Sequence, residues 1–97
     1  MMYLILWEGD GALMPKDPKE RDKLVMGWTE RVKKDLESGD TKMWGVSIGG
    51  GQGFSITEVD PKDIYAKAST YMPYIKFDIR PMLTIDEMIE TMKGMQK

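Results

Sequence analysis

The stretches Asp17-Pro18-Lys19-Glu20 and Asp60-Pro61-Lys62-Asp63 decide how this chain folds. In each stretch an Asp at the N-cap precedes a Pro in the first helical turn and an acidic residue at the third helical position. This combination is typical of a helix start. Each stretch also follows a strand-like segment, so the repeat divides the chain into two β-α-β halves.

Hydrophobic periodicity places the other elements around these two helix starts. The predicted elements are, in chain order, a strand over 2–8, a helix over 18–38, strands over 42–48 and 54–59, a helix over 61–70, a strand over 74–82 and a final helix capped by Thr84. The two middle strands flank a Gly-rich link, which predicts a β-hairpin. The first strand is apolar at nearly every position, as expected of a strand covered on both faces.

The element order β-α-β-β-α-β-α predicts an α+β fold. With right-handed crossovers it gives a ferredoxin-like sandwich, in which four antiparallel strands lie in the order 4-1-3-2 and two helices cover one face. The C-terminal helix is an addition to this plan. A doubly wound parallel sheet is the alternative, and the hairpin between the second and third strands disfavours it. We expect one domain over 1–97.

Composition excludes several classes of function. The chain has 97 residues, a formal net charge of −2, no Cys and no His. Disulfides, thiolate metal sites and His bases are therefore excluded, and we expect no metal and no cofactor. The acidic balance argues against nucleic acid as a partner. No apolar run approaches the roughly 20 residues of a membrane span, so we expect a cytoplasmic protein that does not enter the membrane.

The sheet face opposite the helices is the main candidate interaction surface. We assign the apolar sides of the strands to the helices, namely Trp44, Val46, Ile48, Phe54, Ile56, Ile75, Phe77 and Ile79. The opposite face then carries Met43, Gly45, Ser47, Ser55, Thr57, Lys76, Asp78 and Arg80, with either Tyr3, Ile5 and Trp7 or Leu4, Leu6 and Glu8 from the first strand.

Exposing the apolar centre of that face costs about 25 cal/mol per Å². We therefore predict a homodimer, or a higher homo-oligomer, formed through the uncovered face of the sheet. The alternatives are a monomer whose free face is hydrated, and a monomer whose own C-terminal helix covers that face.

Two segments carry a resemblance to a known family. Residues 71–87 (YMPYIKFDIRPMLTIDE) and 53–60 (GFSITEVD), about a quarter of the chain, resemble the closing and third strands of one uncharacterised family in the dimeric α+β barrel superfamily. That superfamily includes muconolactone isomerases and small cofactor-independent monooxygenases. The resemblance implies a ferredoxin-like dimeric barrel without an established activity. Enzymes of the superfamily often rely on a His in the pocket, which this chain lacks.

Candidate ligand-binding residues come from the strands. Lys76, Asp78 and Arg80 alternate along one side of the last strand, either as an anion-binding wall or as hydrated ion pairs. At the end of the first strand, Trp7 could stack a flat ligand beside Glu8, or could simply be core. The full candidate set is Tyr3, Trp7, Glu8, Ser55, Thr57, Lys76, Asp78 and Arg80.

Two functions remain open from the sequence. The first is a small homodimeric module without catalysis, which either only assembles or also binds a small molecule. The second is a cofactor-independent isomerase or monooxygenase with its site in the barrel cavity. A cavity above about 300 Å³ with convergent polar groups would favour a ligand site. No catalytic residue and no substrate is predicted.

Overall fold

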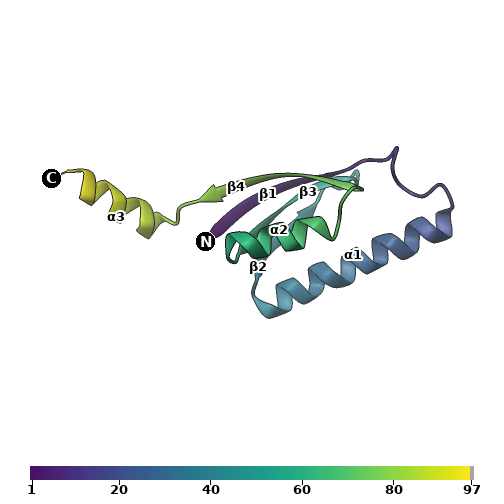
Figure 1. Cartoon of the computed structure of the whole chain (residues 1–97), viewed down its shortest axis with the longest axis horizontal. Coiled ribbons are helices and arrows are strands. Elements are labelled where there is room, and N and C mark those ends of the chain that lie inside the picture. Colours follow the sequence, from purple (N-terminus) through teal and green to yellow (C-terminus); the bar gives the residue numbers. More distant parts are fainter. Residues whose placement is uncertain (97) are drawn as a thin grey trace.

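The computed structural model of the chain describes residues 1–96 and has the predicted order of elements (Figure 1). These are β1 (Met2–Gly9), α1 (Pro18–Ser38), β2 (Thr41–Val46), β3 (Gln52–Glu58), α2 (Pro61–Ser69), β4 (Ile75–Met82) and α3 (Ile85–Met95). The strands form one four-stranded antiparallel sheet in the order β2-β3-β1-β4. The fold is therefore a ferredoxin-like α+β fold, and β1 is an interior strand as predicted.

The helix α1 begins and ends where its sequence signals predict. The carboxylate of Asp17 accepts a hydrogen bond from the Lys19 backbone N–H at 3.1 Å, and Gly39 takes the left-handed conformation with φ 86°. The second copy of the motif starts α2 at Pro61, but Asp60 makes no side-chain cap hydrogen bond. The motif thus sets both helix starts, while the full cap forms only in α1.

Both α1 and α2 lie on the same side of the sheet (Figure 1). Polar contacts join the two helices, since Lys67 Nζ lies 2.8 Å from Asp35 Oδ1 and Arg31 Nη1 donates to the Thr70 carbonyl at 3.3 Å. Trp28 of α1 also contacts Tyr71, with ring centroids 6.2 Å apart. The helices are therefore fixed to each other beside the α2–β4 connection.

The core beneath these helices is small. Among residues 1–96, the buried apolar side chains are Tyr3 and Ile64, with 6% and 7% of their surface exposed. On α1, the apolar side chains of Val25 and Leu36 keep 42% and 41% of their surface exposed. The side chains of α1 therefore do not fill the layer between helix and sheet, and a cavity occupies part of that layer.

The pairing register corrects the predicted faces of β3. Paired residues in an antiparallel sheet share a face, and Ile56 pairs with Leu4 while Ser55 pairs with Ile5. Phe54 and Ile56 therefore lie on the face away from the helices, and Ser55 and Thr57 lie on the helix side, opposite to the prediction. The prediction was wrong because both faces of this sheet are rich in apolar residues, so apolar character alone does not identify the helix side.

The hairpin also differs from the prediction at one end. β2 ends at Val46, and Ser47 and Ile48 belong to the connection rather than to the strand. Ile48 is fully exposed instead of facing the helices. The Ser47 backbone N–H donates to the Gln52 carbonyl at 2.8 Å, which closes the connection before Ile48 can continue the strand.

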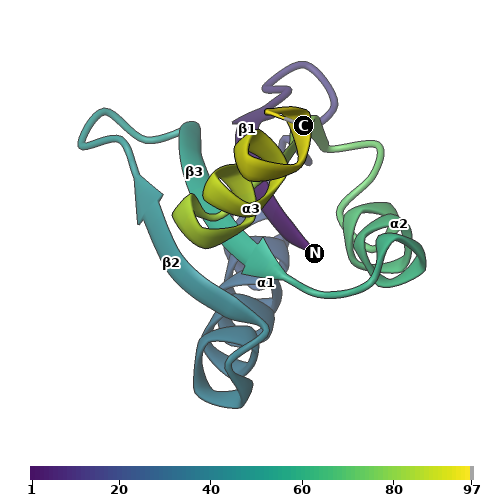
Figure 2. The ribbon, with the colours of Figure 1, turned by 90° about the vertical axis from the view of Figure 1, so that its left-hand side faces the viewer.

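The C-terminal helix α3 projects beyond the end of the sheet (Figure 1), and in the view along the long axis it lies in front of the strands (Figure 2). It begins with a capping box between Thr84 and Glu87. The described chain is elongated, with extents of 61 × 26 × 25 Å. No helix within residues 1–96 has the length and apolar character needed to cross a membrane.

Candidate functional site

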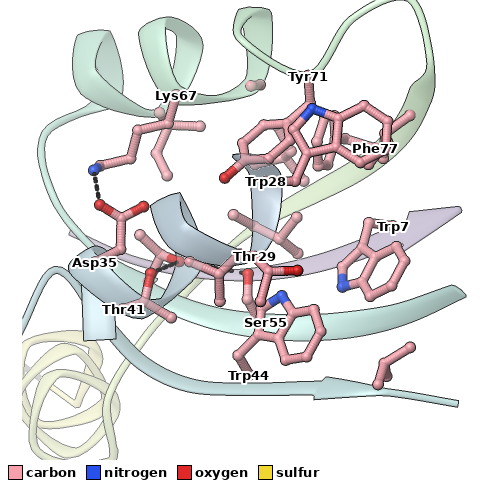
Figure 3. Close-up of a pocket in the computed structure, with 18 of the residues that line it drawn as sticks. Trp7, Trp28, Thr29, Asp35, Thr41, Trp44, Ser55, Lys67, Tyr71 and Phe77 are labelled. Atoms are coloured by element: carbon pink, nitrogen blue, oxygen red, sulfur yellow. Dashed lines mark hydrogen bonds and ion pairs between the residues drawn. The ribbon is translucent and has the colours of Figure 1, made fainter. Parts of the chain in front are cut away.

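A cavity of about 440 Å³ lies between the sheet and the two helices α1 and α2. Aromatic side chains from several elements line it, namely Trp7, Trp28, Trp44, Tyr71 and Phe77. Polar side chains also line it, namely Asp35, Thr41, Ser55, Thr57 and Lys67. Figure 3 shows the Lys67–Asp35 pair and Thr41 at one end, and Trp28, Tyr71, Phe77 and Trp7 at the other. The cavity is therefore apolar at one end and polar at the other.

Two stacked indoles form one wall of the cavity. The rings of Trp7 on β1 and Trp44 on β2 lie 5.5 Å apart between centroids, with 14° between their planes. The strand between them, β3, carries Gly53 opposite Trp7 and Ser55 opposite Trp44. Because these side chains are small, the two indoles meet across β3 and present a continuous aromatic surface to the cavity.

The indole nitrogen of Trp7 is a hydrogen-bond donor that makes no hydrogen bond within the described residues. Trp7 Nε1 is buried and has no hydrogen-bond partner among residues 1–96. A buried donor that lacks an acceptor costs about 1–3 kcal/mol. A bound molecule would supply the missing acceptor only after the ring shifts, because no surface of this atom is open to the cavity.

The floor of the cavity carries three buried hydroxyl groups, those of Thr41, Ser55 and Thr57. Thr57 Oγ1 lies 3.4 Å from Thr41 Oγ1 and 3.5 Å from Ser55 Oγ, which are long distances for hydroxyl hydrogen bonds. Each hydroxyl offers one donor and two acceptor positions. These groups therefore have capacity left for a bound molecule.

The ionisable residues of the cavity are paired. Lys67 bonds Asp35 at 2.8 Å and Asp40 at 3.3 Å. Burial lowers the pKa of Lys67, but the hydrogen bonds and charges of Asp35 and Asp40 outweigh this effect and leave the pKa raised. Burial and the nearby charge of Asp35 raise the pKa of Tyr71. At neutral pH the cavity thus contains a charged ion pair at its polar end and the neutral phenol of Tyr71.

A second, more open groove of about 710 Å³ lies at the hairpin end of the sheet. On the face away from the helices its lining includes Leu6 and Phe54, with Glu8, Lys76 and Asp78 at the polar side. Phe54 lies over Gly45, where an added Cβ would stand 2.6 Å from the ring. Because Gly45 has no side chain, the Phe54 ring can lie close to the strand, and the groove stays deep at this point.

Charged groups on this open face are engaged with neighbours. Arg80 Nη2 bonds Asp78 Oδ2 at 2.7 Å, and this hydrogen bond lowers the pKa of Asp78. Lys76 Nζ lies 4.0 Å from Asp10 Oδ2. Within residues 1–96 no cluster of three or more acidic side chains is placed to hold a metal ion.

The structure divides the predicted site residues between the two faces of the sheet. Tyr3, Trp7, Ser55 and Thr57 face the helices, whereas Glu8, Lys76, Asp78 and Arg80 lie on the open face. Trp7, Ser55 and Thr57 line the helix-side cavity, and Tyr3 is buried beside it.

The sequence patterns did not identify Asp35, Thr41, Lys67 or Trp28 as cavity residues, and they assigned Trp44 only to the side of the sheet that faces the helices. Asp35 and Lys67 are 32 positions apart and belong to no spacing motif, so only the packing of α1 beside α2 reveals the pair.

The fold and the cavity define an α+β protein of ferredoxin-like architecture, with an aromatic cavity between its helices and its sheet. The chain belongs to the family described as a domain of unknown function (DUF3303), whose sequence profile matches residues 1–96. No curated protein gives a significant match to the chain.

Proposed function

We propose that this protein is a homodimeric small-molecule-binding module, and that the cavity between the helices and the sheet is its binding site. The observation that carries the proposal is the wall of stacked indoles, Trp7 and Trp44, beside the buried hydroxyls of Ser55 and Thr57 in that cavity. A cavity of about 440 Å³ falls within the size range of small-molecule sites.

The lining favours one class of ligand. A flat, mostly apolar molecule fits the stacked indoles of Trp7 and Trp44, since aromatic faces pack well on one another. A hydroxyl or carbonyl oxygen on that molecule would bond the hydroxyls of Ser55 and Thr57 on the cavity floor. We therefore propose an aromatic ligand with one oxygen substituent.

Of the predicted site residues, Trp7, Ser55 and Thr57 are proposed to contact this ligand directly, and Tyr3 to support the floor from beside Thr57. Glu8, Lys76, Asp78 and Arg80 lie on the other face. We propose that they border the dimer interface instead, where they remain candidates for a second ligand site. The alternative of a cofactor-free enzyme has no supporting observation among the described residues.

The homodimer is proposed because the open face carries an apolar centre. Leu4, Leu6, Phe54 and Ile56 lie there on neighbouring interior strands, and Met43 is 57% exposed on the edge strand. Covering such a face with a second copy removes the cost of its hydration. A cytoplasmic location also remains a prediction from the composition.

Binding can be tested with the three indole N–H resonances of the isotope-labelled protein, one for each Trp. Naphthol is the probe, and naphthalene is the matched probe without an oxygen. We expect naphthol to shift the Trp7 and Trp44 resonances and to bind about tenfold more tightly than naphthalene, because one additional hydrogen bond to the floor hydroxyls is worth about 1.4 kcal/mol.

Two variants serve as a matched pair in this titration. Trp44→Leu removes one ring of the aromatic wall and should weaken naphthol binding, while Met43→Leu changes the neighbouring residue on the open face and should not. Resonances of Trp7 and Trp44 that stay fixed up to the solubility limit of naphthol would refute the binding proposal. Sedimentation velocity of the wild-type protein from micromolar to millimolar concentration tests the homodimer, and a monomer throughout this range would refute it.

A further inference from the structure

The C-terminal helix α3 carries an apolar stripe that its own chain leaves exposed. Its members are Ile85, Met88, Ile89, Met92 and Met95, and each keeps between 42% and 78% of its surface accessible. The residues recur at helical spacing and lie within about 120° of one side of the helix. Figure 1 shows α3 standing clear of the sheet, so this stripe has no cover from the rest of the described chain.

The sequence nevertheless specifies α3 as a helix. Thr84 Oγ1 accepts from the Glu87 backbone N–H at 3.1 Å, and Glu87 Oε1 accepts from the Thr84 backbone N–H at 3.0 Å. A helix of 11 residues is marginal in water when it stands alone. A capped amphipathic helix of this length therefore indicates that another surface stabilises it by packing.

The open-face groove lined by Leu6 and Phe54 is the unpartnered apolar surface that could receive it, but α3 cannot reach the groove of its own chain. The groove lies where Glu8 pairs with Lys76, whereas α3 leaves from the opposite end of β4, where Met2 pairs with Met82. The separation along β4 from Lys76 to Met82 is six residues, or about 20 Å. A two-residue link, Leu83 and Thr84, then leads α3 further away.

A second copy of the chain resolves this separation. Two copies related by a two-fold axis can pack with their strands running in opposite directions. The groove of one copy then lies at the end of the dimer where α3 of the other copy leaves its sheet. The same operation acts in both directions, so each α3 meets the groove of the other subunit. An exchange of this kind covers both apolar surfaces in a single association.

The available area supports this arrangement. Four strands of about seven residues give the open face a footprint of roughly 19 by 23 Å, or about 440 Å², short of the about 800 Å² that each partner contributes to a stable interface. A helix of 11 residues adds a footprint of roughly 16 by 10 Å. The accessible area exceeds these flat footprints because side chains roughen both surfaces. The open face and the helix together therefore approach the area that a stable dimer buries, whereas the open face alone does not.

We infer that α3 of one subunit packs its apolar stripe into the Leu6–Phe54 groove of a second subunit, and that the dimer exchanges its C-terminal helices. This inference rests on the proposed homodimer and names the element that holds it together. A lipid surface fits α3 less well, because Asp86, Glu87 and Glu90 outnumber the single Lys93 on its polar side.

The absence of Cys from the sequence permits a direct test by disulfide cross-linking. A chain with Met92→Cys is mixed with a chain that carries Leu6→Cys and a mass tag, and the mixture is oxidised. We expect the mixed disulfide to form readily, because exchange would place position 92 against the groove of the other subunit. Glu90→Cys, on the polar side of the same helix, replaces Met92→Cys in the control and should give a several-fold lower yield.

Stability of the dimer gives an independent measurement. Met92→Lys places a charge in the stripe and should raise the dimer dissociation constant about tenfold or more, since it buries an unpaired charge at the contact. Gly94→Lys adds the same charge on the opposite side of the helix, where a Cβ meets nothing within 4 Å, and should leave the dissociation constant nearly unchanged.

The outcomes separate this inference from the proposed function. A wild-type protein that is monomeric refutes the homodimer and the exchange together. A wild-type dimer that Met92→Lys leaves intact, with no mixed disulfide above the control, refutes the exchange alone. A chain carrying both cysteines that forms only an internal disulfide would show that α3 folds back onto its own sheet, which also refutes it. Naphthol binding is unaffected by any of these results.

Discussion

The indole of Trp7 lies over Gly53, the residue with which it pairs on β3. A Cβ added to Gly53 would stand 2.7 Å from Cε2 of that ring and would also meet the Gly45 carbonyl oxygen. The same indole stacks on Trp44 at 5.5 Å between centroids. Because Gly53 has no side chain, the Trp7 ring can lie close to the sheet. The distance between this ring and the sheet in turn sets the shape of the cavity.

We predict that Gly53→Ala displaces Trp7 and breaks its stack with Trp44. Because the added Cβ also meets the backbone carbonyl of Gly45, which cannot turn aside as a side chain can, we expect a loss of at least about 3 kcal/mol of unfolding free energy, the upper end for overpacking. Urea unfolding measures the loss, and near-ultraviolet circular dichroism reports the change in the coupled indoles. An unchanged spectrum together with unchanged stability would contradict the placement of the ring over the glycine.

Gly27→Ala is the opposite case and serves as the control. Gly27 lies inside α1, and a Cβ there would meet nothing within 4 Å. Alanine has a higher helix propensity than glycine, so this substitution should stabilise the protein by about 1 kcal/mol in the same urea experiment. A destabilisation would show that α1 packs against a surface at this position.

Thr57→Val tests whether the buried hydroxyls serve binding or folding. Valine keeps the shape of threonine, and the hydroxyl of Thr57 makes only long contacts, at 3.4 and 3.5 Å. We expect the unfolding free energy to stay the same or to rise by up to about 1 kcal/mol, while naphthol binding weakens. A large loss of stability with unchanged binding would assign the hydroxyls to the fold instead.

The pair of Lys67 and Asp35 should stabilise the contact between α2 and α1. Lys67→Met is expected to cost about 0.5–1 kcal/mol, because the side chains are partly exposed and solvent screens them. Lys62→Met, at an exposed position of α2, is the control and should change little. Equal effects of the two substitutions would show that the ion pair contributes nothing measurable.

The pH dependence of this pair has a defined sign. The pKa of Lys67 is raised in the folded protein, so its stabilisation is complete below the ordinary lysine pKa of about 10.4 and is lost as pH rises through the higher folded value. Above neutral pH, the difference in unfolding free energy between wild type and Lys67→Met should therefore shrink only when the solution becomes strongly alkaline. A difference that already disappears near neutral pH would contradict the raised pKa.

The cap of α3 should weaken in acid. The hydrogen bonds with Thr84 lower the pKa of Glu87, so the cap is complete above the ordinary glutamate pKa of about 4.3 and is lost as pH falls through the lower folded value. Chemical shifts of α3 should report a loss of helicity in that acidic range. Glu87→Gln removes the titrating group, and its α3 shifts should lack this transition; an identical transition in the variant would exclude Glu87 as its origin.

Local signals were sufficient to predict the elements of the fold. The cap at Asp17, the left-handed Gly39 and the capping box at Thr84 all lie where the sequence places them, because each depends on residues close together in the chain. The strand order also followed, since a hairpin between two crossovers leaves the first strand in the interior.

The candidate site was less accessible to prediction. Ser55 and Thr57 were assigned to the open face, and the register of β3 against β1 places them under the helices instead. A shift of pairing by one residue exchanges the two faces of a strand, and a sheet with apolar residues on both faces carries no local mark of which face is covered. The cavity itself depends on how far α1 stands from the sheet, which periodicity does not report.

Helix starts, helix ends, the hairpin and the antiparallel order were determined by the sequence alone, because the forces behind them act within a few residues or along one strand. The tertiary structure alone decided that Trp7 meets Trp44 across Gly53, that Lys67 meets Asp35 across two helices, and that α3 projects from the sheet. These relationships depend on register and on packing distance, which involve residues far apart in the chain.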